Sequence, residues 1–505
     1  MFFKNALDAV TATITNLIAQ GANSRMTDKQ FLEHEISRWE RSPERLMQMK
    51  GFLYYEGDHD VLHRMRTMIG ENGEVQEVKN LPNNKIVDNR YAILVNQKAN
   101  YLLGKPFVID TKNKQYAECL NEIFDNKFMR MLKHTGKAAM NGGIAWLFPY
   151  YDEEGNFCFR MFPAYEILPF WKDKEHTRLD CAIRMYLVVG YEGSEAVTIN
   201  KVEIYDKSGI HRYIWEHGIL TPDIDNPEKN SDLPYLVLET DDGKRLPYNW
   251  NRIPLIAVKF NENEKPLIKR VKSLQDALNA MLSDFENNMQ EDCRNTILIL
   301  KNYDGQDLGE FRRNLATYGA VKVRYDGDAK GGVETLEIKV NADNYQKIIE
   351  IIKKAIIENG MGYDAKDDRL SGNPNQMNIQ SMYSDIDLEA NDMETELQAA
   401  FDELLWFINV HLVNTGKGDY EDENVSIIFN RDMMINESDV IKNCRDSIGI
   451  ISDETIVAMH PWINDVQDEL AKLQKQKEEK QKEMENAYNP FTGNKDKKPD
   501  ETDDE

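Results

Sequence analysis

The chain has 505 residues, with 62 Lys or Arg against 87 Asp or Glu, so its formal net charge is −25 at pH 7. This balance excludes the simplest nucleic-acid binder, a basic domain held on phosphates by counterion release, and an electrostatic grip on anionic membranes. The length is typical of about three domains. No segment approaches ~20 uncharged apolar residues, so no membrane-spanning helix is predicted. Lys4 and Asp8 interrupt the apolar start that a signal peptide needs.

The spacing of the cysteines and the absence of common catalytic motifs argue against metal, disulfide and nucleotide chemistry. No CxxC pair or zinc spacing is present, which fits free thiols in a reducing compartment. The sequence also contains no phosphate-binding loop of the Walker type, no GxSxG, no HExxH and no GxGxxG. No cofactor is therefore expected. The five cysteines are Cys119, Cys158, Cys181, Cys293 and Cys444.

The first part of the chain reads as helices separated by loops. Residues 5–20 have the apolar spacing of an amphipathic helix, and a short aromatic turn follows the second predicted helix at 54–60. Gly104-Lys105-Pro106 is a typical end signal for the third predicted helix, 88–103. The predicted helices are 5–20, 28–50, 88–103 and 114–141.

After Gly142-Gly143 the pattern changes to that of strands. Residues 152–155 form a turn between two of them, as in a β-hairpin. Ile, Val, Tyr and Trp continue the pattern, so we expect an antiparallel β-rich subdomain over 143–260, with a polar loop at 221–247. The predicted strands are 144–151, 156–162, 181–191, 201–206 and 210–217.

Pro266 begins a region of two helices around a small insertion. Apolar residues spaced by 4, 3, 4, 3 and 4 form a stripe on a first helix of about 25 residues. A second helix over 343–358 has a broad apolar face that includes Ile348 and Ile352. The stripe consists of Leu267, Val271, Leu274, Leu278, Met281 and Phe285. The insertion is predicted as strand 296–300, helix 307–316, strand 321–324 and strand 333–340.

Residues 360–378 are rich in Gly, Asn, Asp and Pro and predict a loop of a length that is often functional. A very long helix is expected next, and the chain ends in a tail from Pro490 with almost no apolar residues, which predicts disorder. The elements expected between them are helix 379–413, strand 425–429 and helices 437–449, 452–459 and 464–487.

Two groups of residues are candidates for metal binding. His59 and His63 are four residues apart beside Asp58 and Asp60, but without a third fixed ligand the signal is weak, and a turn capped by either aspartate is favoured. The acidic group around Asp364 suggests a metal-dependent nuclease. A solvated acidic loop is favoured there too, because nothing nearby supplies a base and a phosphate clamp. Its members are Asp364, Asp367 and Asp368.

The order of these parts resembles one family, the portal proteins of tailed double-stranded DNA bacteriophages of the siphophage type. The resemblance covers about 30–465 and rests on an ordered set of segments. They are Tyr54 to Asp60, Asn89 to Pro106, Asn141 to Trp146 with Phe162 to Ile167, and the helix–insertion–helix region followed by Gly372-Asn373-Pro374-Asn375.

The resemblance implies an α+β portal fold that forms a ring. Its parts would be a peripheral wing, two long stem helices, a small α/β clip, a loop facing a central tunnel and a helical crown. The corresponding ranges are wing 1–265 and 379–430, stem helices 266–292 and 343–360, clip 293–342, tunnel loop 361–378, crown 431–487 and disordered tail 488–505.

The resemblance also implies a non-enzymatic function. The ring, of twelve copies in the virion, would sit at one capsid vertex after assembly in the host cytoplasm, with DNA passing through it during packaging and ejection. The implied partners are terminase, the major capsid and scaffolding proteins, and head-completion or connector proteins, with no membrane. The alternative, from another class, is a metal-dependent phage DNA-processing enzyme that uses the acidic clusters.

Two sets of functional residues follow from this interpretation. The stripe from Leu267 to Phe285 would pack the stems of the ring. In the tunnel loop, Lys366 and Arg369 would approach the DNA backbone, or would only pair with neighbouring aspartates. The loop residues proposed to face DNA are Lys366, Arg369, Asn373, Asn375 and Gln376.

Overall fold

The computed structural model shows a mixed α and β chain, as predicted, with two compact units. One unit comprises 1–364 and 385–432, and the other comprises 365–384 and 433–505. The structure describes 28–69, 73–77, 81–224, 230–239, 244–292, 296–301, 307–318, 325–326, 329–330, 332–337, 342–364, 376–431, 437–452, 455–457, 460–463, 469–470, 472–477 and 479. The predicted helices 5–20 and 464–487 and the tail lie wholly or largely outside these residues.

The first described helices differ from the single helix predicted over 28–50. Helix α3 spans Asp28–Glu40 and helix α4 spans Pro43–Glu56. The break arises because Ser42 caps α4, accepting a hydrogen bond from the backbone N–H of Arg45, and proline occupies the first turn. Gly57 ends α4 with a φ of 96°, so the aromatic segment at 54–56 belongs to the helix rather than to a turn.

The helix predicted over 88–103 is confirmed as α5, Arg90–Leu103. The single helix predicted over 114–141 is wrong, because the structure has α6, Lys114–Ile123, followed by α7, Asn126–Gly142. Asp125 separates them by accepting a hydrogen bond from the backbone N–H of Phe128 at 2.8 Å. The apolar period continues across this break, so periodicity alone could not locate it.

The β-rich subdomain is confirmed, and its described residues contain two larger sheets and a separate two-stranded hairpin. The hairpin of β4, Ile144–Tyr151, and β5, Phe157–Pro163, is joined by β14, Ile256–Lys259, in the order β14-β4-β5. A larger sheet has the order β10-β9-β8-β7-β6, with β11 paired to β9. Its strands are β6 Ile167–Trp171, β7 Leu179–Glu192, β8 Glu195–Asp206, β9 Gly209–Glu216, β10 Ile219–Pro222 and β11 Asp232–Leu233.

The polar loop predicted at 221–247 is wrong in part. It contains β11 and also a hairpin of β12, Leu236–Glu239, and β13, Arg245–Tyr248. The alternation of apolar and polar residues in these strands is short and is flanked by polar residues, so the sequence pattern did not reveal it. Helix α3 covers one face of the large sheet, where Ile36 and Trp39 pack among its apolar side chains.

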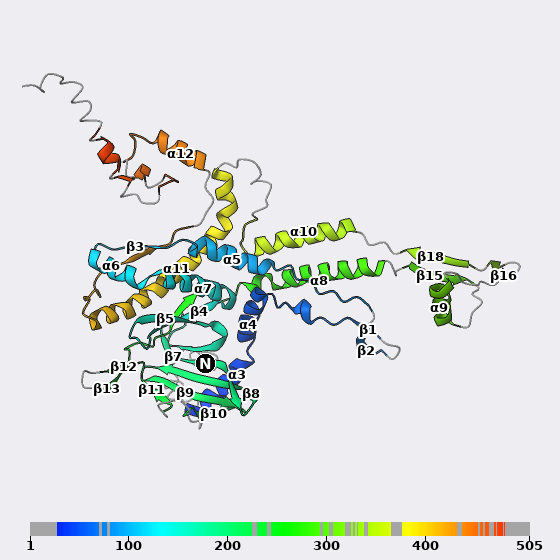
Figure 1. Cartoon of the computed structure of the whole chain (residues 1–505), viewed down its shortest axis with the longest axis horizontal. Helices are drawn as coiled ribbons and strands as arrows, with labels where there is room; N and C mark the ends of the chain where they lie inside the picture. Colours follow the sequence, from blue (N-terminus) through cyan, green and yellow to red (C-terminus); the bar gives the residue numbers. More distant parts are fainter. Residues whose placement is uncertain are drawn as a thin grey trace, which may run out of the picture. The chain divides into compact units, whose positions relative to one another are not determined.

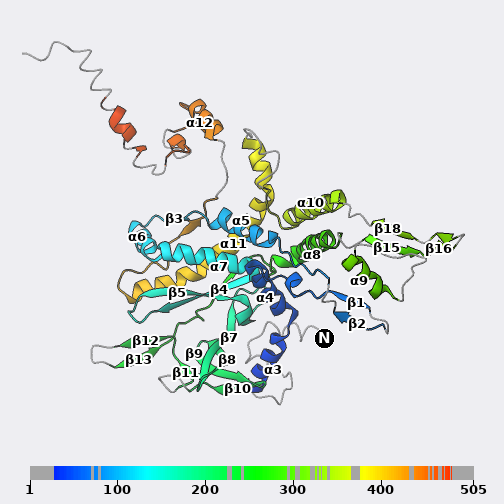
Figure 2. The same ribbon diagram turned by 45° about the vertical axis from the view of Figure 1, so that its right-hand side comes forward.

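Two helices and a small insertion follow, as predicted. Helix α8 spans Ile268–Asp292 and helix α10 spans Ala342–Asn359, and the two lie side by side (Figure 1 and Figure 2). Between them, β15, Thr296–Lys301, pairs with β18, Gly332–Glu337, and α9 spans Leu308–Tyr318. Short strands Tyr325–Asp326 (β16) and Ala329–Lys330 (β17) also pair, whereas the predicted strand 321–324 is outside the described residues.

The long helix is confirmed as α11, Gln376–Asn414. After it, β19, Ser426–Ile428, pairs with β3, Val108–Asp110, and so joins two segments remote in sequence. Helix α12, Glu437–Asp446, belongs to the second unit.

Candidate functional site

Helices α8 and α10 form an antiparallel pair. Near the C-terminal end of α8, the ring of Phe285 lies 5.1 Å from the ring of Tyr345, close to the start of α10. The amide of Asn288 donates a hydrogen bond to the Tyr345 hydroxyl at 3.1 Å. The insertion that contains β15 and β18 therefore begins and ends where the two helices meet.

The predicted stripe on α8 has two kinds of members. Leu267, Val271 and Leu278 are completely buried within the chain itself. The other three are only partly buried, and they are Leu274, Met281 and Phe285. The buried members stabilise the subunit and have no surface for direct contact with another copy. Packing between copies stays a prediction for the partly exposed members.

A second stripe on α8, which the sequence analysis missed, is polar and buried. It consists of Gln275, Asn279, Ser283 and Asn287, four residues apart along one face. Such spacing advances about 6 Å along the helix. The extended segment 84–90 lies against this stripe, and alternate residues of an extended chain advance by nearly the same distance.

Side chains of the polar stripe accept hydrogen bonds from the backbone N–H group of every second residue in that segment. The side-chain oxygens of Asn287, Ser283, Asn279 and Gln275 accept hydrogen bonds from the backbone N–H groups of Asn84, Ile86, Asp88 and Arg90, at 2.7, 3.0, 3.1 and 3.0 Å. For Asn84, Ile86 and Asp88 these contacts replace the partners that a sheet would supply, while the N–H of Arg90, the first residue of α5, also donates to the carbonyl of Asp88 at 2.8 Å. We call segment 84–90 the strap.

His59 has a structural role beside this stripe. It is completely buried, its ring lies 4.3 Å from the ring of Tyr54, and its two nitrogens contact the Tyr54 carbonyl and the Asn279 amide at 3.1 and 2.9 Å. Burial lowers the pKa of His59, which favours the neutral ring. His63 lies elsewhere, 2.7 Å from Asp58.

Asp60 is held by two lysines from different helices. Lys50 of α4 pairs with one oxygen and Lys272 of α8 donates to the other at 2.6 Å, while Lys272 also bonds Asp276 at 2.7 Å. Burial alone raises the pKa of Asp60, but the two ammonium groups hold that pKa well below its usual value. This aspartate therefore ties α4 to α8. Within the described residues, no group of three or more His, Cys, Asp or Glu could hold a metal ion.

The base of the predicted tunnel loop is closely packed on α5. A Cβ atom added to Gly360 or Gly362 would lie 2.5 or 2.4 Å from the side chain of Leu94, so a larger residue at either position would require Leu94 to move. Between them Met361 has a φ of 49°, in the left-handed region that non-glycine residues rarely adopt. The amide of Gln97 donates to the carbonyl of Tyr363 at 3.1 Å and fixes the next turn.

A buried ion pair holds the strained residue. The ammonium of Lys98, on α5, donates to the Met361 carbonyl at 2.7 Å and pairs with Glu389 of α11, which also pairs with Arg270 of α8. Burial lowers the pKa of Lys98, because the charged form loses its water, while Glu389 opposes that effect. This group, which we call the latch, joins three helices to the loop base.

The loop residues singled out from sequence are not placed by the structure. Lys366, Arg369, Asn373 and Asn375 lie outside the described residues, as do Asp367 and Asp368, while Gln376 is the first residue of α11. Their approach to DNA stays a prediction. The helices and glycines that position the loop base are described, and they are the part of the site that can be tested structurally.

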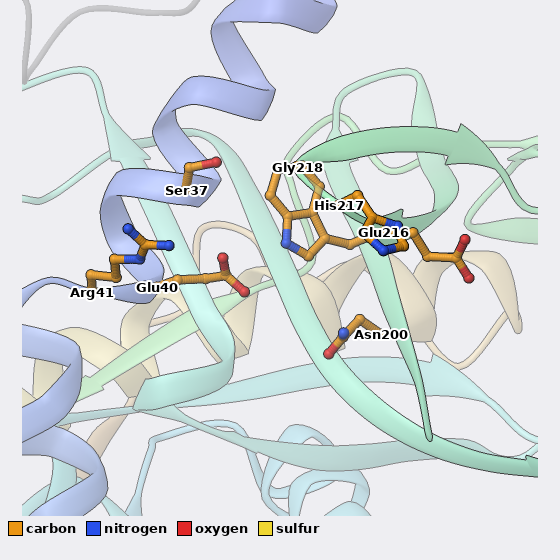
Figure 3. A pocket seen from close by; sticks show the side chains of 8 residues that line it. Ser37, Glu40, Arg41, Asn200, Glu216, His217 and Gly218 are labelled. Atoms are coloured by element: carbon orange, nitrogen blue, oxygen red, sulfur yellow. The ribbon is translucent and has the colours of Figure 1, made fainter. Parts of the chain in front are cut away.

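A separate open groove of about 660 Å³ lies between α3 and the turn joining β9 to β10. Figure 3 shows Ser37 and Glu40 of α3 and the following Arg41 on one side of the groove, with Asn200 and His217 of the sheet side opposite them. The groove is lined by acidic side chains, Glu40 and Glu216, and by a basic one, Arg41. We assign no chemistry to this groove.

Comparison of the sequence with known proteins gives the family of this chain. The family described as phage portal protein, SPP1 Gp6-like, matches residues 32–483. The portal protein of Bacillus phage SPP1 is 30% identical over 440 residues, which cover 86% of this chain and 84% of that protein. The portal protein of Clostridium phage phiCD119 is 26% identical over 453 residues, covering 87% and 94%. The chain therefore belongs to the SPP1-type family of phage portal proteins. None of its described helices is long and apolar enough to cross a membrane.

Proposed function

We propose that the chain forms a closed ring of twelve copies at one vertex of a phage capsid and conducts double-stranded DNA during packaging and ejection. The observation that carries this proposal is the family match over 32–483. The exposed apolar side chains of α10 and the partly buried members of the α8 stripe also support it, since a stem helix pair in a ring must contact its neighbours.

The parts of the chain receive the roles that the resemblance implies. Helices α8 and α10 would be the stem, the insertion at 293–342 the clip, 361–378 the tunnel loop, and 431–487 the crown. Residues 1–265 and 379–430 would be the wing. The clip is a particular reason to expect a ring, because a two-stranded sheet such as β15–β18 is marginally stable alone and gains from pairing with adjacent copies.

The electrostatics of the chain suit a conduit. A tunnel lined with Lys and Arg would hold DNA with an affinity that depends steeply on salt. A chain with a net charge of −25 presents a neutral or mildly repulsive wall, along which DNA can slide in either direction. Sparse basic residues such as Lys366 and Arg369 would then touch phosphates without gripping them.

The same proposal names the partners. The clip would meet terminase during packaging and head-completion or connector proteins afterwards, and the wing would meet the major capsid and scaffolding proteins. The protein would assemble in the host cytoplasm and remain in the virion. Each contact is testable by co-purification with the corresponding proteins of the same phage.

The decisive experiment is the mass and shape of the purified full-length chain. Twelve copies of a 58.6 kDa subunit have a mass of about 700 kDa, and free rings can differ from virion rings by one copy. Light scattering should report a particle of that size and negative-stain microscopy should show annular particles. A clean monomer at micromolar concentration would contradict the proposal.

A further inference from the structure

A hairpin arm projects from the subunit between η1, the 3-10 helix at Asp60–His63, and the strap. Strand β1, Thr67–Ile69, pairs with β2, Val75–Glu77, and Ile69 stands directly opposite Val75. These two β-branched side chains are 74% and 72% exposed. The arm thus presents a cross-strand apolar pair that no described part of its own chain covers.

The base of the arm is held on the stem. Arg64 pairs with Asp284 of α8 at 2.8 Å, and Arg66 donates to the carbonyl of Pro82 at 2.6 Å, across the two strands of the arm. Lys85 of the strap donates to the carbonyl of Leu62 at 2.7 Å. The base of the arm is therefore anchored against α8 and the strap, whereas its two strands form a hairpin that is marginally stable in water without a partner.

The described residues 67–69 and 73–77 of the arm include two acidic side chains and no basic one. Side chains alternate between faces along a strand, so Glu77 lies on the same face as Val75, two positions away. Glu74, one position before Val75, lies on the opposite face by the same alternation, and both glutamates are exposed. A complementary surface would combine exposed aliphatic groups with lysine or arginine.

Helix α10 carries such a surface. Ile348 and Ile351 are 43% and 67% exposed, and Lys347 and Lys354, both exposed, flank Ile351 at helical spacings of four and three residues. Lys354 lies 3.8 Å from Glu358, which is 62% exposed one turn further along the same face. An exposed apolar strip beside two lysines complements the exposed Ile69–Val75 pair and the neighbouring Glu77 of the arm.

We propose that the β1–β2 arm of one copy docks on the Ile348–Ile351 face of α10 in a second copy. The two surfaces are different and occur once in each chain, so the contact is heterologous and can repeat around a closed ring. Both surfaces are exposed in the single chain, which leaves them available to a neighbour. The inference rests on the proposed ring and names the contact that links its subunits.

Disulfide trapping tests this pairing in the full-length protein. The variant V75C/I351C, purified and oxidised, should give a ladder of covalent species extending beyond dimers on non-reducing gels, because each copy links to two neighbours. The wild-type chain, oxidised in parallel, reports the background from native cysteines. V237C/I351C, which moves the first cysteine to an exposed strand of the wing, is the matched control and should remain at that background.

A charge reversal provides a second, independent test. E77K should raise the concentration at which rings form by a few-fold, and adding K354E in the same chain should restore it, because both partners of the pair are then exchanged. I69D/V75D should raise that concentration by about tenfold or more, since it places charge in the apolar contact. Circular dichroism should show an unchanged fold, because the arm is exposed.

The outcomes separate the two proposals. A ladder from V75C/I351C together with rescue by K354E supports the docking. Dimers from V75C alone would show arm-to-arm contact, and normal ring assembly by I69D/V75D would show that the arm is dispensable; either result overturns the docking while the ring survives. A wild-type chain that never assembles overturns both the ring and the docking.

Discussion

The side chain of Asn279 accepts a hydrogen bond from the backbone N–H of Asp88 at 3.1 Å, although the two residues are 191 positions apart. The same asparagine accepts a hydrogen bond from Gln275 and contacts the buried ring of His59. One side chain in the middle of α8 thus joins the strap, the polar stripe and His59, the residue directly before η1. This arrangement predicts a large effect of a small substitution.

Replacing Asn279 with alanine should destabilise the subunit by about 2 to 4 kcal/mol, because at least two buried polar groups lose their partners. The matched control is N263A, which removes an exposed asparagine that contacts only Glu262 and should change stability by less than about 0.5 kcal/mol. Thermal unfolding of both variants gives the comparison. Equal melting temperatures for N279A and wild type would show that the polar stripe does not hold the strap.

The latch makes a second prediction. K98M leaves the Met361 carbonyl without its ammonium donor and Glu389 with only Arg270, so the stability should fall by about 3 to 5 kcal/mol. Hydrogen exchange at the amides of Gly360 and Gly362, which bond to carbonyls of α10, should become faster. The control is K112M, which changes an exposed lysine just before α6 and should leave both measurements near wild type. Unchanged exchange in K98M would mean that glycine packing on Leu94 alone fixes the loop base.

His211 predicts a pH dependence. Hydrogen bonding to Asp206, opposed by burial and aided by Asp232, raises the pKa of His211 from 6.5 to about 9. Because the folded-state pKa is the higher one, the stabilisation is fully present below pH 6.5 and is lost as the pH rises to about 9. The change should be about 1 to 2 kcal/mol, since Asp232 is largely exposed and its contribution is screened.

The pH prediction is checked by unfolding H211Q and wild type between pH 6 and pH 9.5. The variant should lack the decline over this range, whereas H134Q, which changes an exposed histidine on α7, should keep it. A decline of the same size in H211Q would assign the pH dependence to other groups.

The regular elements of this chain could largely be predicted from sequence, since they depend on local apolar spacing. The 25-residue helix after Pro266 and the hairpin of β4 and β5 are examples. Capping residues such as Ser42 and Asp125 divided helices that the period alone joined, because a cap acts on two or three backbone groups without disturbing the apolar pattern. The β12–β13 hairpin was missed because its strands are only four residues long.

The contacts that position the candidate site could be predicted only in part. Gln275, Asn279, Ser283 and Asn287 do repeat every four residues, a signal that the apolar stripe obscured. Their partner is an extended segment nearly 200 residues away, and no local pattern specifies such a pairing. Lys98 and Glu389 likewise read as ordinary surface charges, and only the tertiary structure reveals that they are buried together.

The last prediction concerns the tunnel loop, whose basic residues lie beyond the described base at Gly360–Asp364. K366E/R369E should leave ring assembly, procapsids and terminase docking intact, because the latch and the stem that hold the loop are unchanged. It should reduce the DNA packaged or retained, since two contacts that attract phosphate become repulsive. The measurement is the length of nuclease-protected DNA in a packaging assay on purified procapsids. K112E/K114E, two exposed lysines at the start of α6, makes the same charge change in the predicted wing and should package like wild type. Equal packaging by both double variants would remove Lys366 and Arg369 from the mechanism and leave the portal family assignment intact.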